Sequence, residues 1–217
     1  MTQRALSYHD VLLRQQDVDL LRGNRWLNDQ IISFCFEFLQ QEVVKNNYDV
    51  LLMGPSIAFL LQSADEALAE VITQPLQLDQ RQLILFPINN NPEVNVANGG
   101  SHWSLMTYER NRSVFSHFTS MAGANDHPAQ SLASRMKSLL RDPGATWCVA
   151  TTPQQKNGDD CGVYTAAMAE EAVVMFLQRA SLEQLEVTLE KKLTPSAVTS
   201  WRLTLLHRIS KLQTEQA

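Results

Sequence analysis

The stretch from Gln154 to Gln178 reads QQKNGDDCGVYTAAMAEEAVVMFLQ, and it contains the sharpest change of character in the chain. Its first seven residues are polar and turn-forming, whereas Cys161 opens an apolar run with the length of a long helix. A thiol at a helix N-terminus lies at the positive end of the helix dipole, which favours the thiolate. Thiolate is the nucleophilic form, and Gly162 would allow a substrate backbone to approach it. The alternative is that Cys161 is a small, inert apolar residue at a helix end.

Short strand-like runs lie in the middle of the chain, between two groups of expected helices. Asn28 can cap a first helix, Gly54-Pro55 marks the start of a second, and residues 65–73 suit a third. The strand-like runs cover residues 81–88, 101–108, 113–118 and 146–150, and a further helix is expected over 128–140. Helices, then strands, then helices favour an α+β fold, with residues 1–217 forming a single domain.

The composition is that of a globular protein, with 44% hydrophobic and 19% charged residues among 217. The net charge is −5 and no basic run occurs, which argues against nucleic acid as a partner. No apolar run approaches the ~18 residues that span a bilayer, so no membrane partner is expected. The three cysteines, Cys35, Cys148 and Cys161, show no CxxC spacing and give no disulfide framework or zinc cluster. Free thiols favour a reducing compartment, so we expect the protein in the cytoplasm or nucleus.

A nucleophilic thiol needs a base, and His102 is the histidine best placed to provide one. It follows Gly99, Gly100 and Ser101 and opens a strand-like run, so its ring can face a cleft. The alternative is a partly exposed histidine at a strand end. Gln155 lies in the loop before Cys161 and can aim its side-chain amide at a developing oxyanion, the alternative being ordinary loop solvation.

The segment from Asn89 to Gly100 is polar and rich in turn-forming residues, which predicts a surface loop. It directly precedes His102 in the chain. We therefore expect this segment to act as a lid over the groove that the histidine faces.

Three blocks of this sequence together resemble the Ulp/sentrin-type cysteine proteases, which process and remove small ubiquitin-like modifiers. The first block is Trp26-Leu27-Asn28-Asp29 with Ile31-Ile32, similar to the WLND-x-x-I block of that family. The second is Gly100-Ser101-His102-Trp103-Ser104, similar to its histidine block, and the third is residues 154–162, similar to its QQ-x-NG-x-DCG nucleophile block. The blocks occur in the family's order and span most of the chain.

Within the family, the chain resembles most the deneddylase branch, which acts on the modifier attached by neddylation. The N-terminal residues from Leu6 to Val18, the segment from Phe34 to Phe38 and the run from Gly99 to Leu105 carry this likeness. It implies a thiol protease, a hydrolase of the ubiquitin-like conjugation pathway that acts as isopeptidase and C-terminal hydrolase in deneddylation. Its partners would be the modifier and its protein conjugates, such as cullins, and the enzyme would act as a monomer.

The resemblance also implies a papain-like cysteine protease fold, with a central mixed sheet flanked by helices, and it assigns roles to individual residues. Cys161 would be the nucleophile, His102 the general base and Gln155 the oxyanion-hole side chain. Neither a metal nor a cofactor is implied.

A diglycine tail of the modifier is the expected substrate segment. The resemblance implies that Trp26 and Trp103 enclose this tail in a narrow tunnel, because two flat rings exclude any residue with a branched Cβ. Asp29 would contact a basic residue of the same tail. Trp26 can also be simply a hydrophobic residue that precedes a helix cap.

Thr119 departs from the family pattern. The family's triad acid is an Asp in an Asp-Ser pair, and the ungapped match of Phe115 to Ser120 places Thr119 at that position. The acid fixes the histidine tautomer and stabilises the imidazolium, and a threonine hydroxyl carries no charge for the second task. Three options stay open: a weakened triad, substitution by a nearby acid such as Asp126, or an inactive form that still binds the modifier.

Two other classes of function compete with the enzyme. A catalytically silent module that binds the modifier would explain Thr119, although such a module has no chemical reason to keep Cys161, His102 and Gln155. A plain globular domain with a redox-sensitive thiol would require the nucleophile block to match by chance.

Overall fold

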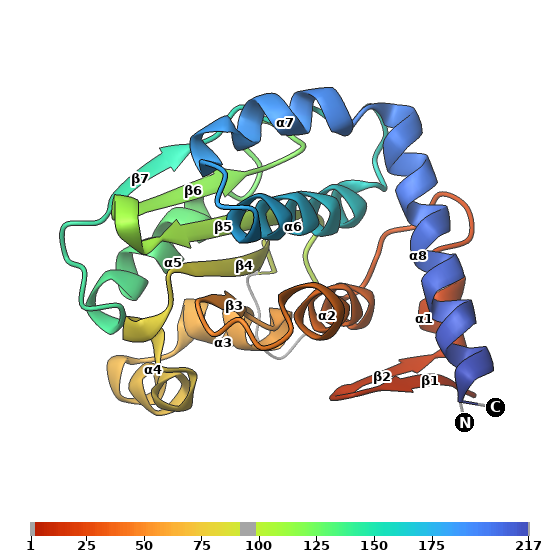
Figure 1. Ribbon diagram of the computed structural model, residues 1–217, viewed down its shortest axis with the longest axis horizontal. Helices are drawn as coiled ribbons and strands as arrows, with labels where there is room; N and C mark the ends of the chain where they lie inside the picture. The colour runs from red at the N-terminus through yellow and green to blue at the C-terminus, as the bar shows by residue number, and fades with distance from the viewer. Residues whose placement is uncertain (1–2, 92–98, 217) are drawn as a thin grey trace.

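A computed structural model describes residues 3–91 and 99–216. A mixed five-stranded sheet, in the order β3-β4-β5-β6-β7, forms its centre, and a separate β1-β2 hairpin lies beside it (Figure 1). The strands are β1 (Arg4–Tyr8), β2 (Val11–Arg14), β3 (Val50–Leu52), β4 (Leu83–Asn89), β5 (Trp103–Glu109), β6 (Val114–Phe118) and β7 (Thr146–Val149). The inner three strands pair antiparallel, whereas β3 and β7 are parallel to their neighbours.

Eight α-helices surround the sheet among the described residues. They are α1 (Gln15–Asp19), α2 (Asp29–Phe38), α3 (Pro55–Ser63), α4 (Glu66–Thr73), α5 (Asp126–Leu139), α6 (Cys161–Leu177), α7 (Leu185–Lys192) and α8 (Pro195–Glu215). Asn28 caps α2, because its side chain accepts a hydrogen bond from the Ile31 amide as the sequence predicts. None of the helices in the described ranges has the length and apolar character needed to cross a bilayer.

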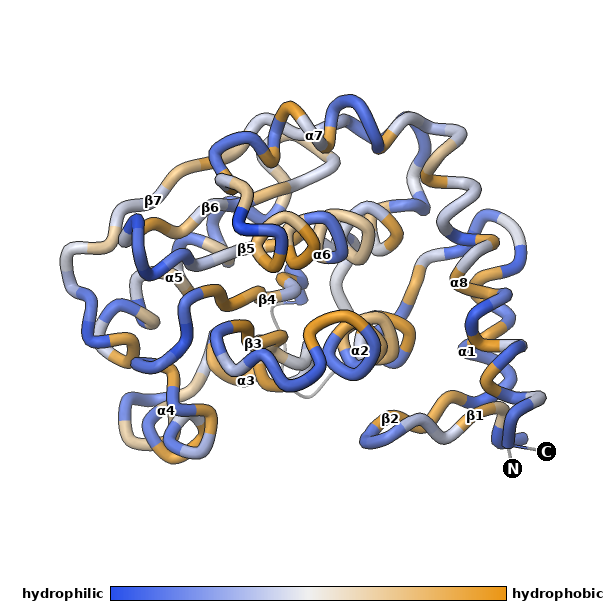
Figure 2. The backbone as a smooth tube through the Cα atoms, viewed as in Figure 1, coloured by the Kyte–Doolittle hydropathy of each residue, from blue (hydrophilic) through white to orange (hydrophobic). Residues whose placement is uncertain are grey.

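The sheet divides two hydrophobic cores, with α6 on one face and α5 on the other (Figure 1). Leu105 of β5 belongs to the core on the α6 side, and its neighbour Met106 belongs to the core on the α5 side. Because helices cover both faces, β4 is buried along its whole length and reads as a continuous apolar run. Figure 2 shows the same concentration of hydrophobic residues on α6 and β4, while α4, α7 and α8 also carry polar residues.

The antiparallel register of β5 brings two chain segments to the same edge of the sheet. Asn89 pairs with Trp103 at one end of β5, and Leu105 pairs with Phe118 of β6. His102 therefore lies just before β5, and Thr119 lies just after β6, next to it. The register thus brings the segments that carry these two residues to the same end of the sheet.

The α+β prediction and the central mixed sheet are confirmed, but the N-terminal third is not wholly helical. It contains the β1-β2 hairpin, whose turn holds His9 at a φ of 48°, and the short strand β3. These strands have only three to five residues, and the turn lacks the Asn-Gly or Asp-Gly signal of a tight hairpin. Such short strands show no clear periodicity, because their partners rather than their own sequence stabilise them.

Candidate active site

Cys161 and His102 line one cavity of about 640 Å³, between the start of α6 and the edge of the sheet. Trp26, Asp29 and Trp103 line the same cavity. The structure thus brings together five of the seven residues that the sequence singled out for this site. Gln155 and Thr119 are not among the residues that line the cavity; Thr119 contacts His102, and Gln155 contacts Ser120, the residue after Thr119.

The thiol of Cys161 is almost fully buried at the first residue of α6. Burial raises its pKa above the ordinary value, while hydrogen bonding from the backbone of Trp103, Gly162 and Cys161 itself acts in the opposite direction. The helix N-terminus favours the thiolate, as the sequence predicts, but burial opposes it and has the larger effect on the pKa. The hydrogen bond from the Trp103 backbone also shows that the sulfur lies next to Trp103, the residue that follows His102.

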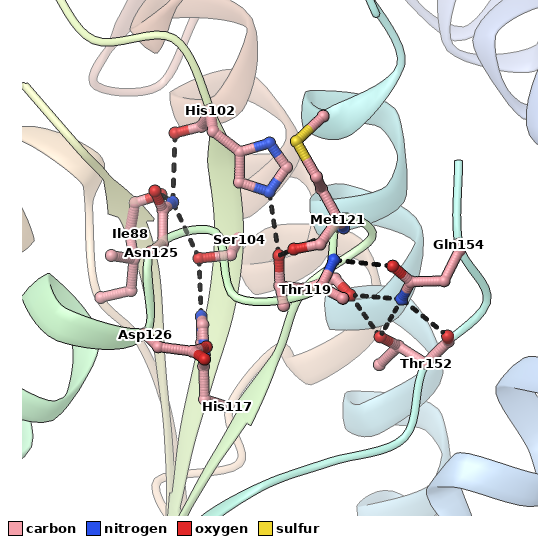
Figure 3. A network of polar contacts seen from close by, with 11 residues as sticks. Ile88, His102, Ser104, His117, Thr119, Met121, Asn125, Asp126, Thr152 and Gln154 are labelled. Atoms are coloured by element: carbon pink, nitrogen blue, oxygen red, sulfur yellow. Dashed lines mark hydrogen bonds and ion pairs between the residues drawn. The ribbon is translucent and has the colours of Figure 1, made fainter. Parts of the chain in front are cut away.

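The ring of His102 is oriented by a hydroxyl group. Its Nε2 atom lies 2.9 Å from the Oγ1 atom of Thr119, which donates its own proton to the carbonyl oxygen of Met121 at 3.1 Å (Figure 3). Because the Thr119 proton is committed to Met121, the hydroxyl accepts a hydrogen bond from Nε2–H. The tautomer with a free Nδ1 lone pair follows from this network.

The imidazole of His102 is neutral at neutral pH. Burial, followed by the charge of the nearby His117, lowers the pKa of His102 from 6.5 to about 4. Thr119 provides orientation but no negative charge that would oppose this shift. The free site consequently holds a thiol and a neutral imidazole rather than an ion pair.

Asp126 does not replace the missing triad acid. Its Oδ1 atom lies 2.9 Å from Nδ1 of His117, a fully buried histidine of β6 whose Nε2 atom contacts Ser104 Oγ at 2.9 Å (Figure 3). Burial lowers the pKa of His117, and Asp126 opposes this effect. The carboxylate thus serves His117 and not His102, because the sheet register points the two histidines at different partners.

Two side chains that the sequence did not single out hold the histidine segment and the Thr119 segment in place. Asn125 Nδ2 donates to the carbonyl oxygen of His102 at 3.2 Å and to Ser104 Oγ at 3.0 Å. Gln154 Nε2 donates to the carbonyl oxygen of Thr119 at 3.1 Å, and its Oε1 accepts from the Ala122 amide at 2.7 Å. No local signal marks Asn125, since its partners lie more than twenty residues away in the chain.

Ser120 fixes the direction of the Gln155 amide. The Ser120 hydroxyl donates to Gln155 Oε1 at 2.7 Å, and Gln155 Nε2 donates to the carbonyl oxygen of Asn157 at 2.8 Å. The amide oxygen of Gln155 therefore accepts a hydrogen bond. Its Nε2 group has two N–H donors, and the bond to Asn157 uses one of them. The sequence predicts a role for the threonine of the Thr119-Ser120 pair but none for Ser120.

The two tryptophans differ strongly in exposure, at 53% for Trp26 and 9% for Trp103. Trp26 Nε1 donates to the carbonyl oxygen of Gly158 at 2.6 Å, and Trp103 Nε1 donates to that of Leu27 at 2.9 Å. Trp103 thus forms part of the core beneath the cavity, while Trp26 forms an exposed wall. Asp29, at the first turn of α2, adds a carboxylate to the same cavity.

Gly162 is required by packing. A Cβ atom at this position would lie 2.9 Å from the Cβ atom of Leu27, which is too close for any residue other than glycine without a shift of the backbone. The glycine thus lets α6 pack against the segment that leads into α2.

The expected lid falls largely on residues 92–98, which lie outside the described residues. At its ends, Asn89, Asn91, Gly99 and Gly100 line the cavity. Within residues 3–91 and 99–216, no group of three or more His, Cys, Asp or Glu side chains is arranged to hold a metal ion.

A buried thiol and a neutral histidine that share one cavity are the working parts of a cysteine peptidase. Residues 25–193 match the Ulp1 protease family, C-terminal catalytic domain. The chain belongs to this family of cysteine peptidases, as its sequence blocks predict.

Full-length relatives agree with this assignment. The chain is 35% identical to NEDD8-specific protease 1 of Arabidopsis thaliana, over 98% of this chain and 95% of the relative. It is 33% identical to the probable sentrin-specific protease 8 of Dictyostelium discoideum, over 96% and 97% of the two chains. The Ulp1 protease domain solved in complex with Smt3, the yeast ortholog of SUMO, has a TM-score of 0.71 at 17% identity and covers 98% of this chain and 89% of its own. That structural likeness confirms the predicted fold.

Proposed function

We propose that this chain is an active cysteine isopeptidase and C-terminal hydrolase, with Cys161 as nucleophile and His102 as general base. The observation that carries the proposal is that both residues line the same cavity, with Trp26, Trp103 and Asp29 around them. These side chains come from three separate parts of the chain. The stability of the fold does not require these side chains to lie together at one cavity.

The neddylation modifier is the proposed substrate. The names of two relatives that cover nearly the whole chain, a NEDD8-specific protease and a probable sentrin-specific protease 8, support this choice. Conjugates of the modifier, such as cullins, would be the protein substrates. The described cysteines are all free, which fits a monomer that works in the reducing cytoplasm or nucleus.

The proposed reaction begins with proton transfer from the Cys161 thiol to the free Nδ1 atom of His102. The thiolate attacks the carbonyl carbon of the modifier's last glycine, and the Gln155 amide and the Cys161 backbone N–H hold the oxyanion. His102 then gives its proton to the leaving lysine amine, and water hydrolyses the thioester to release the modifier. Since burial keeps both groups neutral in the free protein, proton transfer from the thiol to Nδ1 has to accompany the attack on the substrate.

The two rings at the cavity suit a glycine-rich tail. Trp26 would close over the tail as an exposed flap, and Trp103 would form the fixed floor beneath it. Asp29 would pair with a basic residue of the tail at the cavity mouth. This division of roles follows from the different exposure of the two tryptophans.

A mechanism-based probe tests the proposal. The protein is incubated with the neddylation modifier carrying a C-terminal electrophile, and adduct formation is followed by intact mass. We expect one covalent adduct that disappears in Cys161→Ala and persists in Cys148→Ser, the matched control because Cys148 is an exposed thiol on β7. Parallel probes built on SUMO and ubiquitin rank the modifiers, and equal rates with all three would contradict a preference for the neddylation modifier.

A catalytically silent binding module is the second candidate. The uncharged Thr119 beside His102, with the pKa of that histidine lowered to about 4, favours it. This candidate predicts tight, reversible binding of the modifier without any adduct, a result that the same probe experiment records.

A further inference from the structure

Arg202 of α8 has its guanidinium buried far inside the domain, at 6% exposure. All five of its N–H groups have acceptors. Nε and Nη2 donate to Oδ1 of Asp160 at 3.2 and 2.7 Å, and Nη2 also donates to the carbonyl oxygen of Asp159 at 3.3 Å. Nη1 donates to the carbonyl oxygens of Leu20 and Arg25 at 2.9 and 3.0 Å. An arginine whose N–H groups all donate hydrogen bonds holds its acceptor groups in place, and these groups hold the guanidinium in place.

These acceptors belong to the two segments that deliver the cavity walls. Leu20 and Arg25 belong to the segment that ends at Trp26, and Asp159 and Asp160 belong to the loop that ends at Cys161. Figure 1 shows α8 on the side of the domain where the segment leading into α2 and the loop leading into α6 both arrive. Arg202 therefore joins three parts of the chain that are far apart in sequence.

The charge of Asp160 lies one residue from the proposed nucleophile. Burial is the main cause of the raised pKa of the Cys161 thiol, and this carboxylate acts in the same direction, since a nearby negative charge disfavours a thiolate. Asn157 Nδ2 donates to the second carboxylate oxygen at 2.7 Å, so Asp160 is held on both sides. The Arg202 guanidinium is the only described positive group bonded to Asp160, at 2.7 Å.

We propose that Arg202 is a positioning residue for the nucleophile, which neutralises Asp160 and fixes the loop that carries Cys161 against the segment that carries Trp26. The inference rests on the proposed function in that it takes Cys161 as the reacting thiol. Residue 202 lies beyond the part of the chain that matches the family, residues 25–193, so that match does not assign it a role.

A purely structural ion pair is the competing explanation, because buried ion pairs are weak evidence for any specific role. The same helix provides the comparison. Arg208 of α8 pairs with Glu170 of α6 at 2.9 Å, and Glu170 lies nine residues after Cys161 along α6, or about 13 Å at 1.5 Å per residue. Arg208→Gln thus removes a similar ion pair of the same two helices without a charge change near the thiol.

The test measures how the alkylation rate of Cys161 by iodoacetamide depends on pH. All variants carry Cys148→Ser, and the modified cysteine is identified by peptide mass spectrometry. Cys35 is buried and has a raised pKa, so its alkylation would report a loss of folding. The other titratable groups around the thiol are His102, Asp17 and Asp29 in the cavity and Tyr164 one turn along α6. They are the same in every variant, so differences in the profile report the Arg202–Asp160 pair.

The two single variants are expected to shift the alkylation midpoint in opposite directions. Arg202→Gln leaves the Asp160 charge uncompensated, so we expect an alkaline shift of about one pH unit and an alkylation rate about tenfold lower at pH 7.5. Asp160→Asn keeps the hydrogen bonds from Arg202 through its amide oxygen, loses the one from Asn157 and leaves Arg202 charged, so an acid shift is expected. The double variant Asp160→Asn/Arg202→Gln is expected to return close to the parent midpoint, and Arg208→Gln to leave it unchanged.

Shifts in the same direction, or none beyond that of Arg208→Gln, would overturn the inference and leave Arg202 as a structural residue. If Arg202→Gln does not fold, the Asp160→Asn profile decides by itself: an acid shift supports the inference, and an alkaline or absent shift overturns it. Alkylation requires no modifier. A protein that reacts with none of the modifier probes would thus refute the proposed function while the comparison among these variants stands.

Discussion

The Nε2 atom of His102 lies 2.9 Å from the Oγ1 atom of Thr119, so an uncharged hydroxyl occupies the position that an Asp takes in the family pattern. The hydroxyl performs one of the two tasks of a triad acid, because it fixes the tautomer of the ring. It cannot perform the second task, and no carboxylate within residues 3–91 and 99–216 forms a hydrogen bond with His102 to stabilise the imidazolium. The ring of His102 is thus held in a fixed orientation, but no negative charge stabilises its protonated form.

Thr119→Asp is expected to increase turnover, by roughly tenfold. A carboxylate at 2.9 Å would raise the pKa of His102 from about 4 and stabilise the ion pair through which Cys161 reacts. The measurement is kcat/KM against pH with a modifier that carries a fluorogenic C-terminal amide. The acidic limb of that profile is expected to move to higher pH.

Thr119→Val is the matched control for this substitution, because it keeps the shape of threonine and removes the hydroxyl. It leaves the His102 Nε2–H buried without an acceptor, which costs about 1–3 kcal/mol and frees the tautomer. We expect kcat to fall about tenfold or more. If turnover is the same with Thr, Asp and Val at position 119, that residue does not serve the histidine.

Trp26→Ala is expected to weaken substrate capture with little loss of stability. The ring is 53% exposed, so its removal leaves the core intact, and KM is expected to rise about tenfold or more while Tm changes by only a few degrees. Trp103→Ala removes a buried ring, which costs about 3–5 kcal/mol in typical cores. Steady-state kinetics and thermal unfolding of both variants separate the two roles, and an unchanged KM in Trp26→Ala would exclude the proposed flap.

Gln155→Ala is expected to lower kcat by about 10²–10³ at nearly constant KM, the usual effect of removing one oxyanion donor. Ser120→Ala tests the same group indirectly, because the Ser120 hydroxyl holds Gln155 Oε1 at 2.7 Å. We expect a smaller loss in kcat for this variant, about tenfold, with KM preserved. Equal losses of kcat and stability in both variants would instead show that the pair only supports the loop.

The folded domain is expected to lose stability as the pH falls from about 6.5 toward 4. The pKa of His102 is lowered from 6.5 to about 4 and that of His117 is also lowered, both chiefly by burial. For a histidine with a lowered pKa, the unfolded chain binds the proton first, so stability is full above the unfolded value and declines below it. The His102 shift corresponds to a loss on the order of 2–3 kcal/mol across this range.

Urea unfolding midpoints between pH 7.5 and 4 measure this loss. His102→Gln is the control, because a neutral side chain cannot take up the proton, and it is expected to flatten the decline. Midpoints that stay constant down to pH 4.5 in the parent protein would contradict the lowered pKa values.

Local chemistry in the sequence was sufficient for the elements that begin and end with strong signals. Asn28 before an amphipathic run predicts the start of α2, and the change from polar loop to apolar run at Cys161 predicts α6. The β1-β2 hairpin and β3 could not be predicted in the same way. Their residues become strands because of partners, and β3 pairs with a strand that begins more than thirty residues later.

The same distinction between local sequence signals and tertiary contacts applies to the candidate site. The sequence by itself determined the family, and it predicted the thiol, the histidine, the oxyanion side chain and the tryptophans of the site, because those residues stand in contiguous blocks with specific spacing. It also showed that Thr119 stands where an acid is expected, but it could not decide whether Asp126 compensates.

Only the tertiary structure decided that Asp126 serves His117, that burial outweighs the helix end at Cys161, and that Arg202 reaches Asp160 from a helix forty-two residues away. The physical reason is that hydrogen bonding and desolvation depend on distances across the folded chain. Spacing along a sequence fixes which side chains are present, whereas their charge states depend on which groups the fold places beside them.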